Sequence, residues 1–194
     1  MFIRTCAVAL AAVIALTLPS GSVAAQTAIA KAHTLTQAMH RRIVEVRIDG
    51  APLDVIAKLL TRVDLFDPTI HQARFDHSHS VTPGAMGGGS RRICVFTDGR
   101  ELVEPLIVYD PPRAYAYTVD ADASTMALPV REIVLFYEFA DDGSGTLVTI
   151  HAFYDPKISG TGPVIEPVLT GTLRRTFQTA TEVFGGEYIG DRKP

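Results

Sequence analysis

Residues 91–119, RRICVFTDGRELVEPLIVYDPPRAYAYTV, decide the fold class of this chain. Two breaks divide the stretch, Asp98-Gly99 and Asp110-Pro111-Pro112, and each lies between runs rich in β-branched and aromatic residues. Gly, Asp and Pro in such positions are typical of turns between strands. Strands joined by turns this short run antiparallel, because a parallel crossover needs a dozen or more residues. The stretch therefore predicts an antiparallel meander without crossover helices.

Strand signals continue on both sides of this meander. Apolar residues alternate with polar ones or form short β-branched runs, and Gly, Asp or Pro separates them. One segment instead has apolar residues three and four positions apart, as in a short amphipathic helix. The predicted elements are a strand over 42–48, the short helix over 52–61, a strand over 70–78, a glycine-rich loop over 83–90, and strands over 130–140 and 146–154.

The C-terminal segment has the period of a long amphipathic helix. Gly185-Gly186 is a natural end for it, and two prolines leave two starts open, near Pro163 or close to Glu166. A curved antiparallel sheet with this helix on one face buries the apolar stripe, so the predicted fold class is α+β. The stripe consists of Ile165, Val168, Leu169, Leu173, Phe177, Ala180, Val183 and Phe184.

Residues 1–25 are typical of a secretory signal peptide. Arg4 precedes an almost continuous apolar run from Cys6 to Leu18, and small residues at 23–25 provide a cleavage site after Ala25. The run is too short for a membrane span. We therefore expect a periplasmic or secreted protein with a flexible leader over 26–38 and no stable membrane span after cleavage. Cys94 is then the only cysteine of the mature chain, which excludes an internal disulfide.

Composition and motifs exclude several classes of function. A net charge of −3 over 194 residues suits one globular domain and disfavours a broad nucleic-acid surface. The glycine-rich stretch lacks a following Lys-Ser or Lys-Thr, so a flexible lip is favoured over a phosphate loop. His71, His77 and His79 would share one face of an unbroken strand, but no carboxylate or cysteine on that face completes a metal site. We expect no cofactor and no metal.

A series of short motifs also occurs in a fixed order along the chain. They are Ala51-Pro52 with Val55, Pro83-Gly84 through Gly89-Ser90-Arg91-Arg92, Asp98-Gly99 with Glu104, Asp110-Pro111-Pro112-Arg113 with Tyr115 and Tyr117, Gly145-Thr146 with Val148, and the final helix. In this order they resemble the START/Bet v 1-like superfamily, whose bacterial branch is the polyketide cyclase/dehydrase and lipid-transport (SRPBCC) family.

This resemblance implies a helix-grip fold: a curved antiparallel sheet wrapped around a long C-terminal helix, with a short helix after the first strand. It places the domain at residues 39–188 and leaves a tail at 189–194. It further implies a mostly apolar cavity between sheet and helix that takes a lipid, a polyketide or an aromatic metabolite. The superfamily has no shared catalytic signature, so the fold alone leaves the chemistry open.

Arg92 and Glu104 are the candidate charged groups of such a cavity, because they lie on paired strands and can share one face. Inside a cavity they would orient a polar group of a ligand or poise a carboxylate for proton transfer. If the pair instead faces solvent, it would contribute under about 1 kcal/mol to the stability of the folded protein. We favour a structural or orienting ion pair over a catalytic base. The other pocket candidates have polar-tipped or apolar side chains on strands and on the final helix: Tyr117, Tyr137, His151, Leu169, Leu173 and Phe177.

Three functions follow from these observations. The first is an exported binding protein that holds a small hydrophobic or amphipathic ligand, and the lack of a nucleophile or cofactor motif favours it. The second is a cyclase- or dehydratase-type enzyme in which Glu104, Tyr137 or His151 moves a proton, with no catalytic residue assigned. The third is a periplasmic accessory protein that acts through a protein partner.

Overall fold

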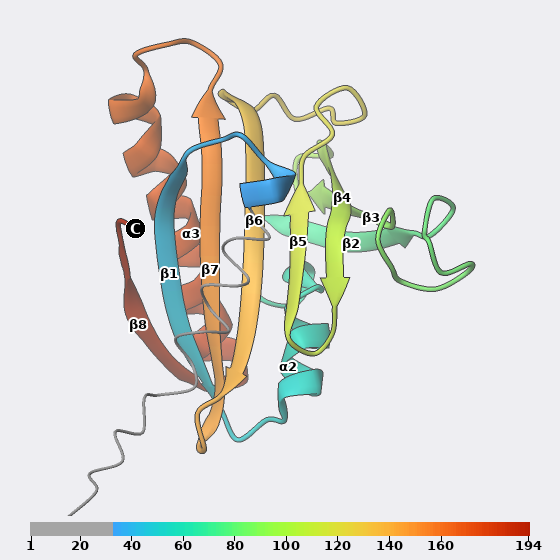
Figure 1. The fold of residues 1–194 in the computed structure, drawn as a ribbon, viewed down its shortest axis with the longest axis vertical. Coiled ribbons are helices and arrows are strands. Elements are labelled where there is room, and N and C mark those ends of the chain that lie inside the picture. The colour runs from blue at the N-terminus through green and yellow to red at the C-terminus, as the bar shows by residue number, and fades with distance from the viewer. Residues whose placement is uncertain (1–32) are drawn as a thin grey trace, which may run out of the picture.

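The computed structural model describes residues 33–194, so the predicted signal peptide lies outside the described residues. Eight antiparallel strands form one sheet, in the order β2-β3-β4-β5-β6-β7-β1-β8. The long helix α3 lies along one face of this sheet, and the short helix α2 follows β1 (Figure 1). The elements are β1 (His40–Asp49), α2 (Leu53–Leu59), the 3₁₀ turn η1 (Val63–Leu65), β2 (Ile70–Asp76), β3 (Arg91–Phe96), β4 (Glu101–Asp110), β5 (Ala114–Thr118), β6 (Val130–Asp141), β7 (Gly145–Pro156), α3 (Gly162–Phe184) and β8 (Gly186–Arg192).

This architecture confirms the predicted α+β helix-grip fold. β3, β4 and β5 form the predicted meander, and β6 and β7 extend it through the turn at residues 142–144. β1 then pairs with β7, which brings the start of the domain beside its last strands. None of the helices within residues 33–194 is long and apolar enough to cross a lipid bilayer.

Helix α3 begins at Gly162, so the earlier of the two predicted starts is correct. Pro163 lies in the first turn, where a missing backbone N–H costs nothing because that group has no partner inside a helix. Pro167 lies inside the helix and removes one backbone hydrogen bond there. The helix ends at Phe184, before Gly185 with a positive φ of 81°.

One end of the sheet holds α3 in place. Arg42 of β1 donates hydrogen bonds to Glu166 at 2.9 Å and to the Thr170 hydroxyl at 3.1 Å. Arg174 of α3 donates to Asp191 of β8 at 2.7 Å. The helix accordingly packs mainly on β1 and β8, and less closely on β7. The helix therefore lies farther from the middle of the sheet than from its β1–β8 edge.

Both ends of the described chain differ from the sequence expectation. The expected tail at 189–194 largely belongs to β8, which pairs with β1 at the sheet edge. The expected leader over 26–38 is packed in its described part: the Thr36 hydroxyl donates to Glu132, and Ala38 is buried. These ends therefore cover the edge and the outer face of the sheet.

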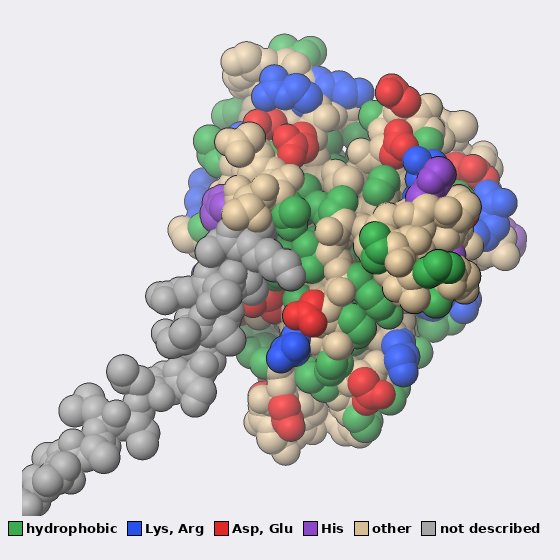
Figure 2. Space-filling view, turned by 45° about the vertical axis from the view of Figure 1, so that its right-hand side comes forward, with side chains coloured by type: hydrophobic (Ala, Val, Ile, Leu, Met, Phe, Trp, Pro, Cys, Tyr) green, Lys and Arg blue, Asp and Glu red, His purple; other side chains and the backbone are tan. Residues whose placement is uncertain are grey.

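The outer face of the sheet, opposite α3, carries a second apolar cluster. Its members come from β4 to β7 and from the segment before β1. On the molecular surface, Figure 2 shows hydrophobic side chains interspersed with polar and charged ones. This burial stabilises the packing of the N-terminal segment on the sheet. The cluster consists of Ala38, Val108, Ala114, Ala116, Val134, Phe136 and Phe153.

His151 lies on this outer face and not in the predicted cavity. Side chains alternate along a strand, and Ala152 and Tyr154 of β7 point toward α3, so His151 points away. Its Nε2 lies 2.7 Å from Glu138 Oε2, and its Nδ1 lies 3.3 Å from His40 Nε2. His151 therefore joins the polar edge of the outer cluster.

Acidification is expected to destabilise this outer cluster through His40. Burial lowers the pKa of His40 from 6.5 to about 4, and the neighbouring His151 and His33 add to the shift, as Arg192 does weakly. The unfolded chain then takes up a proton that the folded protein resists, so the contribution of His40 is complete above about pH 6.5 and falls as the pH drops toward 4. Urea unfolding at pH 7.5, 6 and 5 measures the loss. His40→Gln should lose less stability than the wild type over this range, and equal losses would contradict the account.

Candidate functional site

A hollow of about 140 Å³ lies between α3 and the middle of the sheet. It occupies the region that the helix leaves open by packing on β1 and β8. Most of its wall is aliphatic or aromatic, as in most small-molecule sites. The lining residues are Leu102, Glu104, Tyr117, Thr118, Val119, Leu128, Ile133, Leu135, Ala152, Tyr154, Leu169, Thr172 and Leu173.

The volume of this inner cavity limits the size of the ligand that fits without movement of the protein. An apolar cavity of ~150 Å³ accepts a benzene-sized molecule, whereas drug-sized ligands occupy roughly 300–1,000 Å³. A volume of about 140 Å³ corresponds to a single ring or a short branched chain. A larger ligand needs movement of a wall.

Arg92 and Glu104 form a buried ion pair beside the cavity, as the sequence predicted. They face each other in the β3–β4 register, and Arg92 Nε donates to Glu104 Oε2 at 2.8 Å. Their exposed fractions are only 2 % and 6 %. The Cys94 thiol donates to the same Oε2 at 3.2 Å. Because the two charges are opposite and lie together, the pair places a carboxylate in the interior without adding net charge there.

Further contacts satisfy the guanidinium of Arg92. Its Nη1 donates to the Thr61 backbone carbonyl at 3.2 Å, and its Cζ lies 4.0 Å from the centroid of the Tyr117 ring. This cation–π contact orients the Tyr117 ring against the cavity wall. Burial alone would lower the pKa of Arg92, but the attraction of Glu104 opposes it, and the pKa is raised well above its usual value. Arg92 therefore stays charged and holds Glu104 in place.

Three tyrosines pack in the same layer. The Tyr115 ring centroid lies 4.6 Å from that of Tyr137 and 5.5 Å from that of Tyr117. Burial raises the pKa of all three phenols, to about 12 for Tyr137, so they are protonated at neutral pH. Within residues 33–194, three buried hydroxyls have no hydrogen-bond partner: those of Tyr115, Tyr117 and Tyr154.

The structure divides the predicted pocket residues into three groups. Glu104, Tyr117, Leu169 and Leu173 line the inner cavity. Arg92, Tyr137 and Phe177 lie behind this wall, where the rings of Tyr137 and Phe177 are 6.1 Å apart. His151 is on the other face of the sheet.

Sequence analysis did not place Tyr154 in the pocket, although the signal was present. Every second residue of β7 lies on the same face of the sheet. One such set is Val148, Ile150, Ala152 and Tyr154, and it is more apolar than the set that contains His151. The apolar set faces α3, since that face is the more deeply buried. This alternation places Tyr154 on the cavity side of the sheet and His151 on the opposite side.

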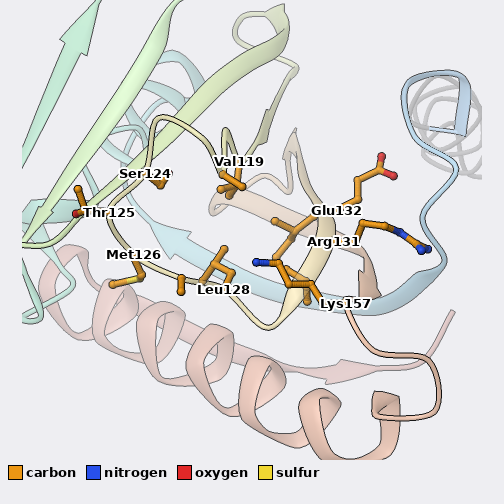
Figure 3. Close-up of a pocket in the computed structure, with 12 residues that line it drawn as sticks. Val119, Ser124, Thr125, Met126, Leu128, Arg131, Glu132 and Lys157 are labelled. Carbon is orange, nitrogen blue, oxygen red and sulfur yellow. The ribbon is translucent and has the colours of Figure 1, made fainter.

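An outer pocket of about 170 Å³ adjoins the inner cavity (Figure 3). The segment over 119–130 forms much of its wall, and the two hollows share Val119, Leu128 and Ile133. In Figure 3 the amino group of Lys157 points toward this segment, whereas the guanidinium of Arg131 points outward. Through Val119 and Leu128, the 119–130 segment borders both the inner cavity and the outer pocket.

The predicted histidine and glycine features lie away from this site. His71 is exposed on β2, and His77 Nδ1 lies 3.0 Å from the Ser90 hydroxyl. Within the described part of the chain, no three His, Cys, Asp or Glu side chains are arranged to hold a metal ion. The glycine-rich loop packs on itself and donates from Gly89 N to the Leu106 carbonyl.

Comparison with known proteins places this chain in a family. Residues 39–184 match the model of the polyketide cyclase / dehydrase and lipid transport family. The chain belongs to this family. The match begins just before β1 and ends with α3, so it contains the whole cavity wall. No curated protein matches the chain.

Solved structures show the same fold at low sequence identity. XoxI from Bacillus cereus is 17 % identical with a TM-score of 0.56, over 75 % of this chain and 96 % of that one. A Thermobifida fusca protein is 21 % identical with a TM-score of 0.55, over 75 % and 92 % of the two chains. The major latex-like protein 151 of Panax ginseng is 16 % identical with a TM-score of 0.53, over 74 % and 98 %. These likenesses support the Bet v 1-like helix-grip fold.

Removing one partner of the buried ion pair should destabilise the fold strongly. Glu104→Ala leaves the Arg92 guanidinium buried without its counter-charge, which costs about 3–5 kcal/mol in unfolding free energy. Glu101→Ala is the matched control on the same strand, because the exposed Glu101–Arg74 pair contributes only about 0–1 kcal/mol. Denaturant unfolding measures both. Similar losses in the two variants would contradict a buried, structurally important pair.

Proposed function

We propose that the protein binds a small apolar or amphipathic molecule in the inner cavity. The observation that carries this proposal is the hollow of about 140 Å³ between α3 and the sheet, with a largely apolar wall. Burying an apolar ligand there gains about 25 cal/mol per Å² of apolar surface removed from water. Membership of the polyketide cyclase / dehydrase and lipid transport family supports this type of ligand.

Binding is better supported than catalysis by the groups at the cavity. Burial raises the pKa of the Cys94 thiol, which disfavours the thiolate needed for nucleophilic attack. Burial likewise keeps the Tyr137 phenol protonated, and His151 lies on the opposite face. Of the three proton-transfer candidates, only Glu104 lines the cavity, and it is already paired with Arg92. An orienting role for this pair agrees with that geometry.

The segment over 119–130 is the proposed route of entry. Its inner side borders the cavity through Val119 and Leu128, and its outer side borders the outer pocket. Backbone hydrogen bonds from Asp120 N to the Val103 carbonyl and from Thr125 N to the Glu101 carbonyl attach it to β4. Displacing Leu128 would join the two hollows and admit a longer ligand, with its polar end near Lys157.

Export of the protein is a separate proposal that rests on the sequence of residues 1–25. Cleavage after Ala25 should give a mature protein that begins at Gln26. Intact-mass measurement of the protein from the exported fraction of its host tests this expectation. A full-length chain that stays with the cytosolic fraction would contradict it.

Filling the inner cavity should abolish ligand binding. Leu173→Trp adds volume to a side chain that lines the cavity, whereas Val168→Trp adds it at an exposed position on the same helix. Benzene binding, measured by the rise in melting temperature with ligand concentration, should fall at least about tenfold in Leu173→Trp and stay unchanged in Val168→Trp. Wild-type protein that binds no benzene, or equal binding by all three proteins, would contradict the proposed function.

A further inference from the structure

Three histidines lie close together on the outer face of the sheet, on the side opposite the inner cavity. They are His33 in the segment before β1, His40 at the start of β1 and His151 of β7. From their geometry we propose that they bind one zinc ion. Imidazole nitrogen is a preferred ligand of Zn²⁺. This site is separate from the inner cavity and does not depend on the function proposed for it.

His40 and His151 already have the spacing of two ligands of one ion. Nε2 of His40 lies 3.3 Å from Nδ1 of His151, and the two ring centroids are 5.2 Å apart. A tetrahedral ion with Zn–N bonds of about 2.0–2.1 Å places two ligand nitrogens about 3.3 Å apart and their ring centroids about 5.2 Å apart. A straight hydrogen bond of the same length would put the centroids about 5.6 Å apart. The observed distances therefore fit two nitrogens that converge on one point.

His33 is the third ligand of the proposed site. Its ring centroid lies 6.3 Å from that of His40, and the side chain is exposed. A shift of the ring by about 1 Å brings it to the centroid distance of two rings on one tetrahedral ion. Among the described residues two ligands are thus at ligand spacing, and no third is yet in place. Three histidines and one water make a common zinc coordination.

A carboxylate orients His151 from the side away from the proposed ion. Nε2 of His151 lies 2.7 Å from Oε2 of Glu138. An ionised carboxylate only accepts hydrogen bonds, so Nε2 carries the proton and Nδ1 keeps its lone pair for the ion. Without the ion, His40 Nε2 can donate to this lone pair, and with the ion His40 carries its proton on Nδ1. Histidine ligands of zinc commonly donate their other N–H to a carboxylate, so Glu138 is a positioning residue.

Pairing of β1 with β7 brings two of these ligands together. The expectation of no metal considered only histidines that are close in sequence, whereas His40 and His151 are 111 residues apart. The register of the two strands shifts between His40 and Arg42. Irregularities of this kind re-aim a side chain, and here the ring of His40 meets that of His151. An ion at this point joins the segment before β1 to the sheet.

Zinc titration of the full-length protein, prepared without a histidine tag, tests the proposal. Calorimetry at pH 7.5 should show one Zn²⁺ bound per chain. Replacing His33, His40 or His151 by Gln should weaken zinc binding at least about tenfold, and Glu138→Gln should weaken it about tenfold through the orientation of His151. His71→Gln is the matched control, because His71 is exposed on β2, and this variant should bind zinc like the wild type.

Cobalt and thermal unfolding distinguish a built site from binding to single surface histidines. Four-coordinate Co²⁺ absorbs visible light much more strongly than six-coordinate Co²⁺, so the wild type should give intense bands that disappear when Zn²⁺ is added. Zinc should raise the melting temperature of the wild type and leave that of His40→Gln unchanged. The melting temperature of each variant in EDTA shows whether it is folded.

The outcomes that overturn the proposal are specific. Wild-type protein that binds no zinc, or binds it no more tightly than His40→Gln, would contradict the site. A loss of affinity in His71→Gln equal to that in His151→Gln would mean adventitious binding by surface histidines only. Benzene binding should be unchanged in His40→Gln, because the inner cavity lies on the other face of the sheet, so failure of the metal site leaves the proposed function standing.

Discussion

The seating of α3 on one end of the sheet is the constraint on which the rest of the structure depends. Arg42 of β1 donates to Glu166 of the helix, and Arg174 of the helix donates to Asp191 of β8. Phe177 is buried where the helix meets the core. With the helix held there, the curved sheet cannot close fully on its other side. The inner cavity is the space that this geometry leaves beside β4 to β7.

This arrangement also explains why charged and phenolic groups lie inside a small domain. Arg92 contacts Glu104, the Thr61 carbonyl and the face of the Tyr117 ring, and these three contacts offset the cost of burying its charge. Glu104 is thereby fixed at the cavity wall with one oxygen able to accept a further bond. The ion pair thus serves the fold and presents a polar group to the cavity at the same time. A binding role follows from this geometry without any reactive nucleophile.

Local sequence signals predicted the elements and the ion pair, but not every face of the sheet. Asp98-Gly99 determines that β3 and β4 form a hairpin, and Arg92 and Glu104 then face each other. The prediction for His151 was wrong because it rested on the residue type and not on the alternation of side chains along β7. That alternation places Tyr154 at the cavity. β8 was missed because Gly186 and Gly190 weaken its pattern, and pairing with the edge of β1 makes it a strand. That pairing is a tertiary effect that local sequence does not encode.

Xenon offers the most direct measurement of the central claim, that an apolar hollow lies between α3 and the sheet. Dry apolar cavities of this size take up xenon, whereas packed cores do not. Crystals of the protein pressurised with xenon should show a strong anomalous peak between Leu169, Leu173 and Leu135, which line the cavity. Side chains that fill this space, with no xenon bound there, would contradict the account.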